Sequence, residues 1–270
     1  MDANEFDRIS NLVVSKQWDA HDAFRPDGRT MLDMLVELLT PLKPLERVLV
    51  SDLLADYLVV WEYNEEVIET LNQIVERSEG KPIIVSPVKD FKAQKVKSGS
   101  ALTFEFNRHI HFFPDSKFTF TEDPSSDRFQ SFKGFRVLVD DFIGSGNQFL
   151  EMTEYLAENN CSSDANLVTA IVIQEEGKQK LEEAGFQVYS PHERTKSIKR
   201  LVTDEGYDNT DAYGLYDEIE ARLGCHDDFK RGFGQSEATV TLKKTPNNTL
   251  PIFWYQGKNS WPAPFPRPRS

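Results

Sequence analysis

Two neighbouring carboxylates, Asp140 and Asp141, precede a short loop that contains two glycines. Glycine allows the backbone to adopt positive φ and to approach a ligand closely, so the loop amides can converge on one anion. These amides belong to Gly144, Ser145, Gly146, Asn147 and Gln148. A helical pattern follows from about Gln148 to Glu158, and the partial positive charge at its N-terminus would act on the same anion. The stretch therefore predicts a phosphate site.

The two carboxylates predict a different kind of contact. Asp140 and Asp141 cannot bind a phosphate, because like charges repel, so we expect them to face a neutral polyol or a cation beside it. A phosphorylated sugar with free hydroxyls would make both kinds of contact, because its phosphate would bind the loop amides and its hydroxyls would face the two carboxylates. Acidic residues before Gly-x-Gly also occur in ordinary α/β turns, which is the structural alternative.

Alternating strands and helices have to position these residues. Val137 to Asp140 begin as a buried parallel strand would, with the acidic pair at its carboxyl end. Further strands are expected at residues 81–87, 166–173 and 186–189, and a helix at 175–184. This alternation predicts an α/β fold with a right-handed parallel sheet, whose ligands lie at the carboxyl ends of the strands.

The segments outside this core are less regular. Apolar residues at helical spacing predict a helical N-terminal layer over residues 1–79, before the α/β core at 80–200 and a C-terminal cap with an extended tail at 201–270. Residues 98–107 fit a helix, and the alternation of Leu102, Phe104 and Phe106 also fits a strand. The sequence leaves both possibilities open there.

The string from Val137 to Gln148, Val-Leu-Val-Asp-Asp-Phe-Ile-Gly-Ser-Gly-Asn-Gln, resembles the phosphoribosyl-pyrophosphate (PRPP) signature of type I phosphoribosyltransferases. The resemblance implies a phosphoribosyltransferase-like core in which Asp140 and Asp141, as catalytic residues, hydrogen-bond the ribose hydroxyls. It implies that the 5′-phosphate binds the following loop. The implied substrate-binding residues are Phe142, Ile143, Gly144, Ser145, Gly146, Asn147 and Gln148. Ser145 replaces the commoner Thr, and Gln148 stands where Thr or Ser is usual.

A second loop follows the strand that ends at Pro87. In the family the corresponding loop grips the pyrophosphate, and Ser86, Pro87, Val88 and Lys89 occupy its place. The usual glycines of that loop are missing here. Further lysines follow at Lys92, Lys95 and Lys97, so the alternative is an exposed basic loop.

The C-terminal part carries a narrower resemblance. Residues 232–236 (Gly-Phe-Gly-Gln-Ser), residues 246–251 (Pro-Asn-Asn-Thr-Leu-Pro) and Trp261 with Pro266 and Arg267 resemble phosphoribosyltransferase-like proteins of bacterial anti-phage gene sets, including some retrons. That resemblance implies a protein partner within a defence complex. Phe253 and Trp254 could stack on a ring of a ligand, or the segment could tie the tail onto the core.

Composition excludes some classes of function. The chain has 270 residues, of which 39% are hydrophobic, so it can form a substantial core. The net charge of -13 argues against broad nucleic-acid binding, which draws its affinity from Lys and Arg. Neither a run of 18 apolar residues nor a signal-peptide core occurs, so we expect a cytoplasmic protein that does not enter a membrane.

The resemblance to type I phosphoribosyltransferases implies a magnesium-dependent enzyme that transfers a phosphoribosyl group from PRPP. We expect Mg²⁺ to bind through PRPP, near Asp140 and Asp141, without a dedicated protein site. The sequence does not identify the acceptor or the oligomeric state. The alternative is a non-catalytic subunit that senses a phosphoribosyl ligand, or binds a protein, on the same scaffold.

Overall fold

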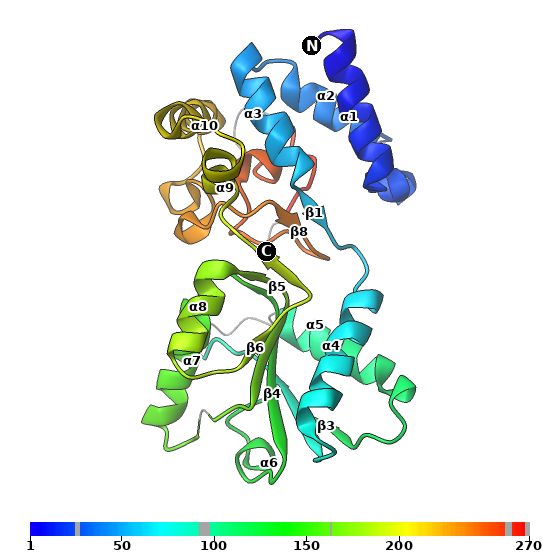
Figure 1. The fold of residues 1–270 in the computed structure, drawn as a ribbon, viewed down its shortest axis with the longest axis vertical. Helices are drawn as coiled ribbons and strands as arrows, with labels where there is room; N and C mark the ends of the chain where they lie inside the picture. The colour runs from blue at the N-terminus through cyan, green and yellow to red at the C-terminus, as the bar shows by residue number, and fades with distance from the viewer. Residues whose placement is uncertain (25–27, 92–97, 163, 257–260, 268–270) are drawn as a thin grey trace. The chain divides into compact units, whose positions relative to one another are not determined.

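The computed structural model describes residues 1–24, 28–91, 98–162, 164–256 and 261–267 (Figure 1). The chain forms two compact units. The core unit is Glu62–Arg194, and the terminal unit joins Met1–Trp61 to Thr195–Ser270. This division differs from the expected ranges 1–79, 80–200 and 201–270, because the two ends of the chain share one unit. Lys92, Lys95 and Lys97 of the predicted basic loop lie outside the described residues.

A parallel sheet with the strand order β3-β2-β4-β5-β6, in which β7 also pairs with β5, forms the centre of the core unit. Its strands are β2 (Ile83–Pro87), β3 (Phe118–Phe120), β4 (Phe135–Ile143), β5 (Leu167–Gln174), β6 (Val188–Tyr189) and β7 (His192–Arg194). All residues of β2 and β5 are buried, as their continuous apolar runs predict. The predicted α/β fold with a parallel sheet is therefore confirmed.

Helices cover both faces of this sheet (Figure 1). They are α4 (Asn64–Ser78), α5 (Ser98–His109), the 3-10 helix η2 (Ile110–Phe112), α6 (Asp127–Gln130), α7 (Asn147–Glu158) and α8 (Glu175–Glu183). The helices α7 and α8 lie on one face, where Phe149, Leu156 and Leu181 pack with Leu138 of β4. The helices α4 and α5 lie on the other. The loops that lead from β4 to α7 and from β5 to α8 begin at the carboxyl ends of these strands.

The structure decides the open question at residues 98–107, which form the first part of α5. Leu102 and Phe106 are fully buried at helical spacing, whereas Phe104 between them is 67% exposed. The apparent alternation of the three apolar residues does not correspond to one buried face.

The terminal unit is mainly helical. Its elements are α1 (Ala3–Ser15), η1 (Trp18–Phe24), α2 (Met31–Leu39), α3 (Pro44–Ala55), β1 (Leu58–Val59), α9 (Ser197–Asp204), α10 (Asn209–Leu223), η3 (Asp227–Phe229), η4 (Phe233–Gln235), β8 (Val240–Thr241) and η5 (Pro251–Phe253). The predicted helical character of the N-terminal segment is confirmed, except at β1. This short strand pairs in parallel with β8, which joins the two ends of the chain.

Aromatic residues from both ends of the chain form the core of the terminal unit. Phe265 is fully buried, stacks on Tyr57 with ring centroids 4.3 Å apart, and meets Trp18 edge to face at 5.3 Å. Trp254 is 7% exposed, and its indole Nε1 donates a hydrogen bond of 2.7 Å to the Thr249 carbonyl. The idea that Phe253 and Trp254 stack on a ligand is therefore wrong, and this segment ties the tail onto the core.

Glu220 of α10 is a buried carboxyl group whose ionisation lowers the stability of the terminal unit. Burial raises the pKa of Glu220 to about 7, although its Oε1 accepts a hydrogen bond of 2.7 Å from the Arg231 amide. From about pH 4.5 to 7 the folded state holds a proton that the unfolded state has lost, so stability falls as the pH rises through this range.

The variant Glu220→Gln is therefore expected to raise the free energy of unfolding at about pH 8 and to leave it nearly unchanged at about pH 4. Urea denaturation at the two pH values measures this difference. An equal change at both would contradict the role of the buried proton.

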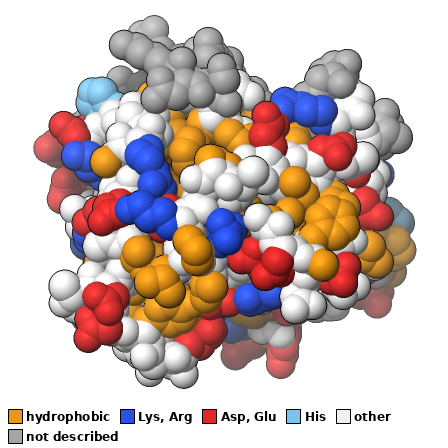
Figure 2. Space-filling model, turned by 90° about the horizontal axis from the view of Figure 1, so that it is seen from above, with side chains coloured by type: hydrophobic (Ala, Val, Ile, Leu, Met, Phe, Trp, Pro, Cys, Tyr) orange, Lys and Arg blue, Asp and Glu red, His pale blue; other side chains and the backbone are white. Residues whose placement is uncertain are grey.

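Figure 2 shows one face of the molecule, on which hydrophobic side chains gather in separate patches. Among the described side chains of that face, Lys and Arg alternate with Asp and Glu.

None of the helices in the described ranges combines the length and apolar character needed to cross a bilayer.

Candidate functional site

The loop between β4 and α7 carries backbone amides that are available to an anion. Gly146 precedes the first residue of α7 with φ 74°, a left-handed conformation that glycine adopts without strain. Within the described part of the chain, the amides of Ser145, Gly146 and Gln148 have no hydrogen-bond acceptor, and the Asn147 amide has only Ser145 Oγ at 3.5 Å. These donors lie at the positive end of a helix of 12 residues. The loop can therefore hold a phosphate.

Helix α8 lies directly against this loop. A Cβ atom added to Gly177 would lie 2.1 Å from the Gly144 carbonyl oxygen and 3.1 Å from a methyl carbon of Ile143. A Cβ at Gly146 would in turn meet the Gly177 carbonyl oxygen at 3.2 Å. Only a glycine at position 177 allows this approach, because every other side chain would overlap the loop. The sequence analysis missed Gly177, although a glycine in the first turn of a helix after a buried strand is a signal of close packing.

The acidic pair lies inside β4 and not after it. The strand continues to Ile143, and Asp140 pairs in register with Ala170 of β5. The sequence expectation ended the strand too early, because two acidic residues are uncommon inside a buried strand. Asp140 and Asp141 are each 8% exposed, and the Asp141 amide donates a hydrogen bond of 2.9 Å to Asp140 Oδ1. Only a small part of each carboxylate side chain is therefore open to a ligand.

The first turn of α5 lies beside this acidic pair. A Cβ atom at Gly99 would lie 3.5 Å from Asp140 Oδ1, 3.1 Å from the Pro87 Cβ and 3.2 Å from the Val139 carbonyl oxygen. A carboxylate at the N-terminus of a helix is stabilised in its charged form by the helix dipole. Gly99 thus lets the first turn of α5 approach Asp140, a contact that the sequence analysis did not predict.

The predicted pyrophosphate loop is largely buried. Ser86 and Pro87 form the end of β2, where Ser86 is fully buried and Pro87 is also buried. Val88 is 2% exposed, and its amide donates a hydrogen bond of 2.9 Å to the Val139 carbonyl. The pairing with β4 continues to Val88, so the Val88 amide is already used, and Pro87 has no N–H group to offer a ligand. Lys89 is the first residue of the segment to reach the surface.

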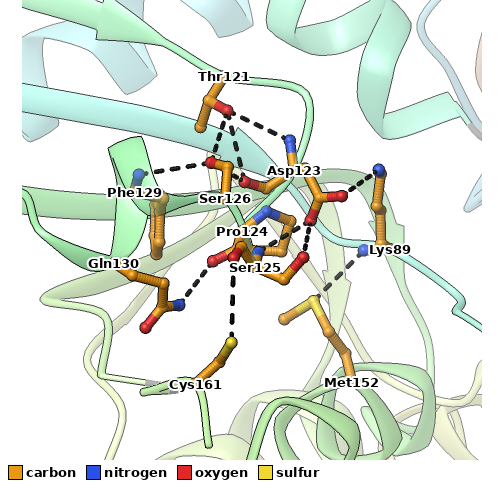
Figure 3. Close-up of polar contacts among 10 residues, drawn as sticks. All are labelled: Lys89, Thr121, Asp123, Pro124, Ser125, Ser126, Phe129, Gln130, Met152 and Cys161. Atoms are coloured by element: carbon orange, nitrogen blue, oxygen red, sulfur yellow. Dashed lines mark hydrogen bonds and ion pairs between the residues drawn. The ribbon is translucent and has the colours of Figure 1, made fainter. Parts of the chain in front are cut away.

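The Lys89 side chain is held by a neighbouring loop (Figure 3). Its ammonium group lies 3.0 Å from Asp123 Oδ2, and its amide donates to Met152 Sδ at 3.3 Å. Asp123 Oδ1 also accepts hydrogen bonds from the Ser125 amide at 2.8 Å and from Ser125 Oγ at 2.7 Å. Burial raises the pKa of Asp123, but the hydrogen bonds from Ser125 and Lys89 outweigh it and lower the pKa below its usual value. The charge on Lys89 is therefore already matched by an ionised partner.

A small hollow opens between Lys89 and the exposed face of α7. It has a volume of about 230 Å³, including space open to solvent. The lining residues are Lys89, Asp90, Phe91, Gln148, Glu151, Met152 and Tyr155. The rings of Phe91 and Tyr155 stack with centroids 4.2 Å apart, which fixes the segment after Lys89 against the helix. Gln148, predicted to belong to the phosphate loop, lies in the first turn of α7 and borders this hollow.

The structure thus brings together one part of the predicted site. The loop amides, Asn147 and the acidic pair all lie at or near the carboxyl end of β4. Ser86, Pro87 and Val88 are buried in the sheet or directly behind it. Among the described residues, no group of three or more His, Cys, Asp or Glu side chains could hold a metal ion.

Comparisons with known proteins found a family model and solved structures that are similar to this chain. The family model PRTase-CE, in which PRTase abbreviates phosphoribosyltransferase, matches residues 22–267. The structure of orotate phosphoribosyltransferase from Aeropyrum pernix is similar at 16% identity and a TM-score of 0.33, over 52% of this chain and 74% of that chain. Adenine phosphoribosyltransferase from Thermoanaerobacter pseudethanolicus is similar at 13% identity and a TM-score of 0.29, over 47% of this chain and 78% of that chain. None of the curated protein sequences matches the chain. Because the family model spans most of its length, the chain belongs to the PRTase-CE family.

Proposed function

We propose that this protein binds PRPP with magnesium and transfers its phosphoribosyl group to an acceptor. The observation that carries the proposal is the set of loop amides without acceptors at the start of α7, placed just after two carboxylates of the same strand. A phosphate on these amides would leave the attached sugar within reach of Asp140 and Asp141. Membership of the PRTase-CE family supports this assignment.

In this proposal the protein positions the substrate and supplies charged groups around it. The loop amides hold the 5′-phosphate, and the two carboxylates accept hydrogen bonds from the ribose hydroxyls. The bond between the anomeric carbon and pyrophosphate breaks, its electron pair leaves with pyrophosphate, and a lone pair of the acceptor forms the new bond. The acceptor then loses its proton to solvent. Positive charge develops on the sugar ring during this exchange, and the nearby carboxylates stabilise it.

The residues present fit magnesium that arrives with the substrate. Magnesium often binds one or two carboxylates together with phosphate oxygens, and Asp140 and Asp141 supply two neighbouring carboxylates. When bound, the ion would neutralise charge on the pyrophosphate. A resident ion with a full set of protein ligands does not fit the described residues.

Calorimetric titration of PRPP into the protein, with magnesium and with a chelator, tests the binding step. We expect saturable binding that requires magnesium, because the Lys89 ammonium group, which was predicted to neutralise the pyrophosphate, already lies 3.0 Å from Asp123 Oδ2. Slow release of pyrophosphate, with water as the acceptor, tests the transfer step. Absence of PRPP binding under both conditions would overturn the proposal.

A second candidate function has its own support. Ser86, Pro87 and Val88 are buried, and Lys89 is paired with Asp123, so the leaving-group half of the site has few exposed donors. These observations favour a non-catalytic subunit that binds PRPP or another phosphoribosyl ligand. Such a subunit would bind PRPP and return it intact after long incubation. The role in anti-phage defence and the protein partner stay predictions.

A further inference from the structure

We propose that Lys180 of α8 is a ligand of the anion bound at the loop between β4 and α7. The inference rests on the proposed function and adds to it the class of ligand: a terminal phosphate monoester that carries nearly two negative charges. Neither the PRPP signature in the sequence nor the strand that carries it contains this residue.

The position of Lys180 follows from the packing of α8. Gly177 contacts the Gly144 carbonyl, and Leu181 Cγ lies 3.6 Å from the place of a Cβ at Gly146. Residues three and four positions apart share one helix face, so Lys180 lies on the face that Gly177 and Leu181 turn toward the loop. Its ammonium group donates a hydrogen bond to Asn147 Oδ1, at the first residue of α7. The cation is therefore held beside the loop amides.

Within the described part of the chain, the Lys180 ammonium group donates its hydrogen bond to the neutral amide oxygen of Asn147 and not to a carboxylate. Lys178, on the same helix, instead lies 2.6 Å from Glu193 Oε1, and this hydrogen bond raises the pKa of Lys178. Lys180 is thus the lysine of α8 that can exchange a neutral acceptor for an anionic one.

Such an exchange strengthens the hydrogen bond, because a bond between two charged groups is shorter and stronger than one to a neutral amide. A phosphate monoester carries close to two negative charges near neutral pH. The loop amides and the α7 N-terminus supply only partial positive charges, equivalent to about half a unit. Lys180 adds a full positive charge. The site should therefore prefer a monoester over a phosphate diester, which carries a single charge.

Calorimetric titration of ribose 5-phosphate, and of PRPP with magnesium, tests the inference in wild type, Lys180→Met, Lys180→Arg and Lys178→Met. We expect Lys180→Met to weaken binding about tenfold at low salt, since a charged hydrogen bond contributes on this scale. The slope of log affinity against log salt should also fall in this variant. Lys180→Arg keeps the charge and should bind within about threefold of wild type. Lys178→Met removes the same charge from the other face of α8 and should bind like wild type.

The outcomes separate this inference from the proposed function. Binding by wild type and equally by Lys180→Met would overturn the role of Lys180 and leave the phosphoribosyl site intact. Equal weakening in Lys180→Met and Lys178→Met would show a general charge effect and would also overturn it. Failure of wild type to bind either ligand would overturn the inference together with the proposed function.

Discussion

Replacing Asp140 and Asp141 together by Asn is expected to weaken magnesium-dependent binding of PRPP by more than about a hundredfold. Each carboxylate would accept a hydrogen bond from a ribose hydroxyl, and a hydrogen bond to a charged group contributes about 1.5–3 kcal/mol. Asn has nearly the same shape, and its amide oxygen can still accept the hydrogen bond from the backbone of residue 141. The variant should therefore fold, and calorimetry with PRPP and magnesium measures the loss.

Ribose 5-phosphate provides an internal control for this double variant. The loop amides are unchanged by the substitutions, so some affinity for the phosphate should remain. Unaltered binding of PRPP by a folded double variant would show that the sugar lies elsewhere. Asp140 and Asp141 would then have a purely structural role.

The second large effect is expected from Gly177→Ala. The new methyl group would lie 2.1 Å from the Gly144 carbonyl oxygen, so the loop has to move by roughly 1 Å. Overpacking of this kind costs about 1–3 kcal/mol of stability. A displacement of about 1 Å at a binding loop can also weaken function by about a hundredfold. We therefore expect a lower melting temperature and a large loss of affinity for ribose 5-phosphate.

Gly214→Ala is a matched control for this prediction. Gly214 lies in α10 with no heavy atom within 4 Å of its added Cβ. Alanine is preferred over glycine in a helix, so this variant should be as stable as wild type or more stable, and should bind normally. If Gly177→Ala also bound ribose 5-phosphate normally, the position of the loop against α8 would be irrelevant to the site.

The two parts of the candidate site are the loop between β4 and α7 and the segment that ends at Lys89. They differ in how many hydrogen-bond donors they leave open to a ligand. The loop between β4 and α7 offers amides without acceptors, whereas Lys89 is committed to Asp123 and the residues before it are buried. Binding of pyrophosphate through Lys89 would have to break this ion pair. Release of pyrophosphate is therefore the measurement that distinguishes an enzyme from a sensor.

The amino-acid sequence by itself determined the parallel sheet and the place of the glycine-containing loop between β4 and α7. Continuous apolar runs such as Leu167–Gln174 predict buried strands because both faces of a parallel sheet are covered. Gly146 could be recognised because a residue with positive φ before a helix is a local requirement. The acidic pair was visible for a similar reason, since charged residues next to a buried strand stand out.

Other features depend on residues that are far apart in the chain. The terminal unit exists because Phe265 packs on Tyr57 and Trp18, and because β1 pairs with β8, contacts that no local periodicity reports. For this reason the expected domain ranges, which follow the chain in order, differ from the two observed units.

At the site, only the tertiary structure decided which charges and glycines act together. The pairing of Lys89 with Asp123 and the approach of Gly177 to Gly144 join separate βα connections at one end of the sheet. A sequence records which side chains are available, but the distance between two of them depends on how strands and helices pack. Lys180 shows this most clearly, because its place beside the loop follows from the packing of α8 and not from any motif that contains it.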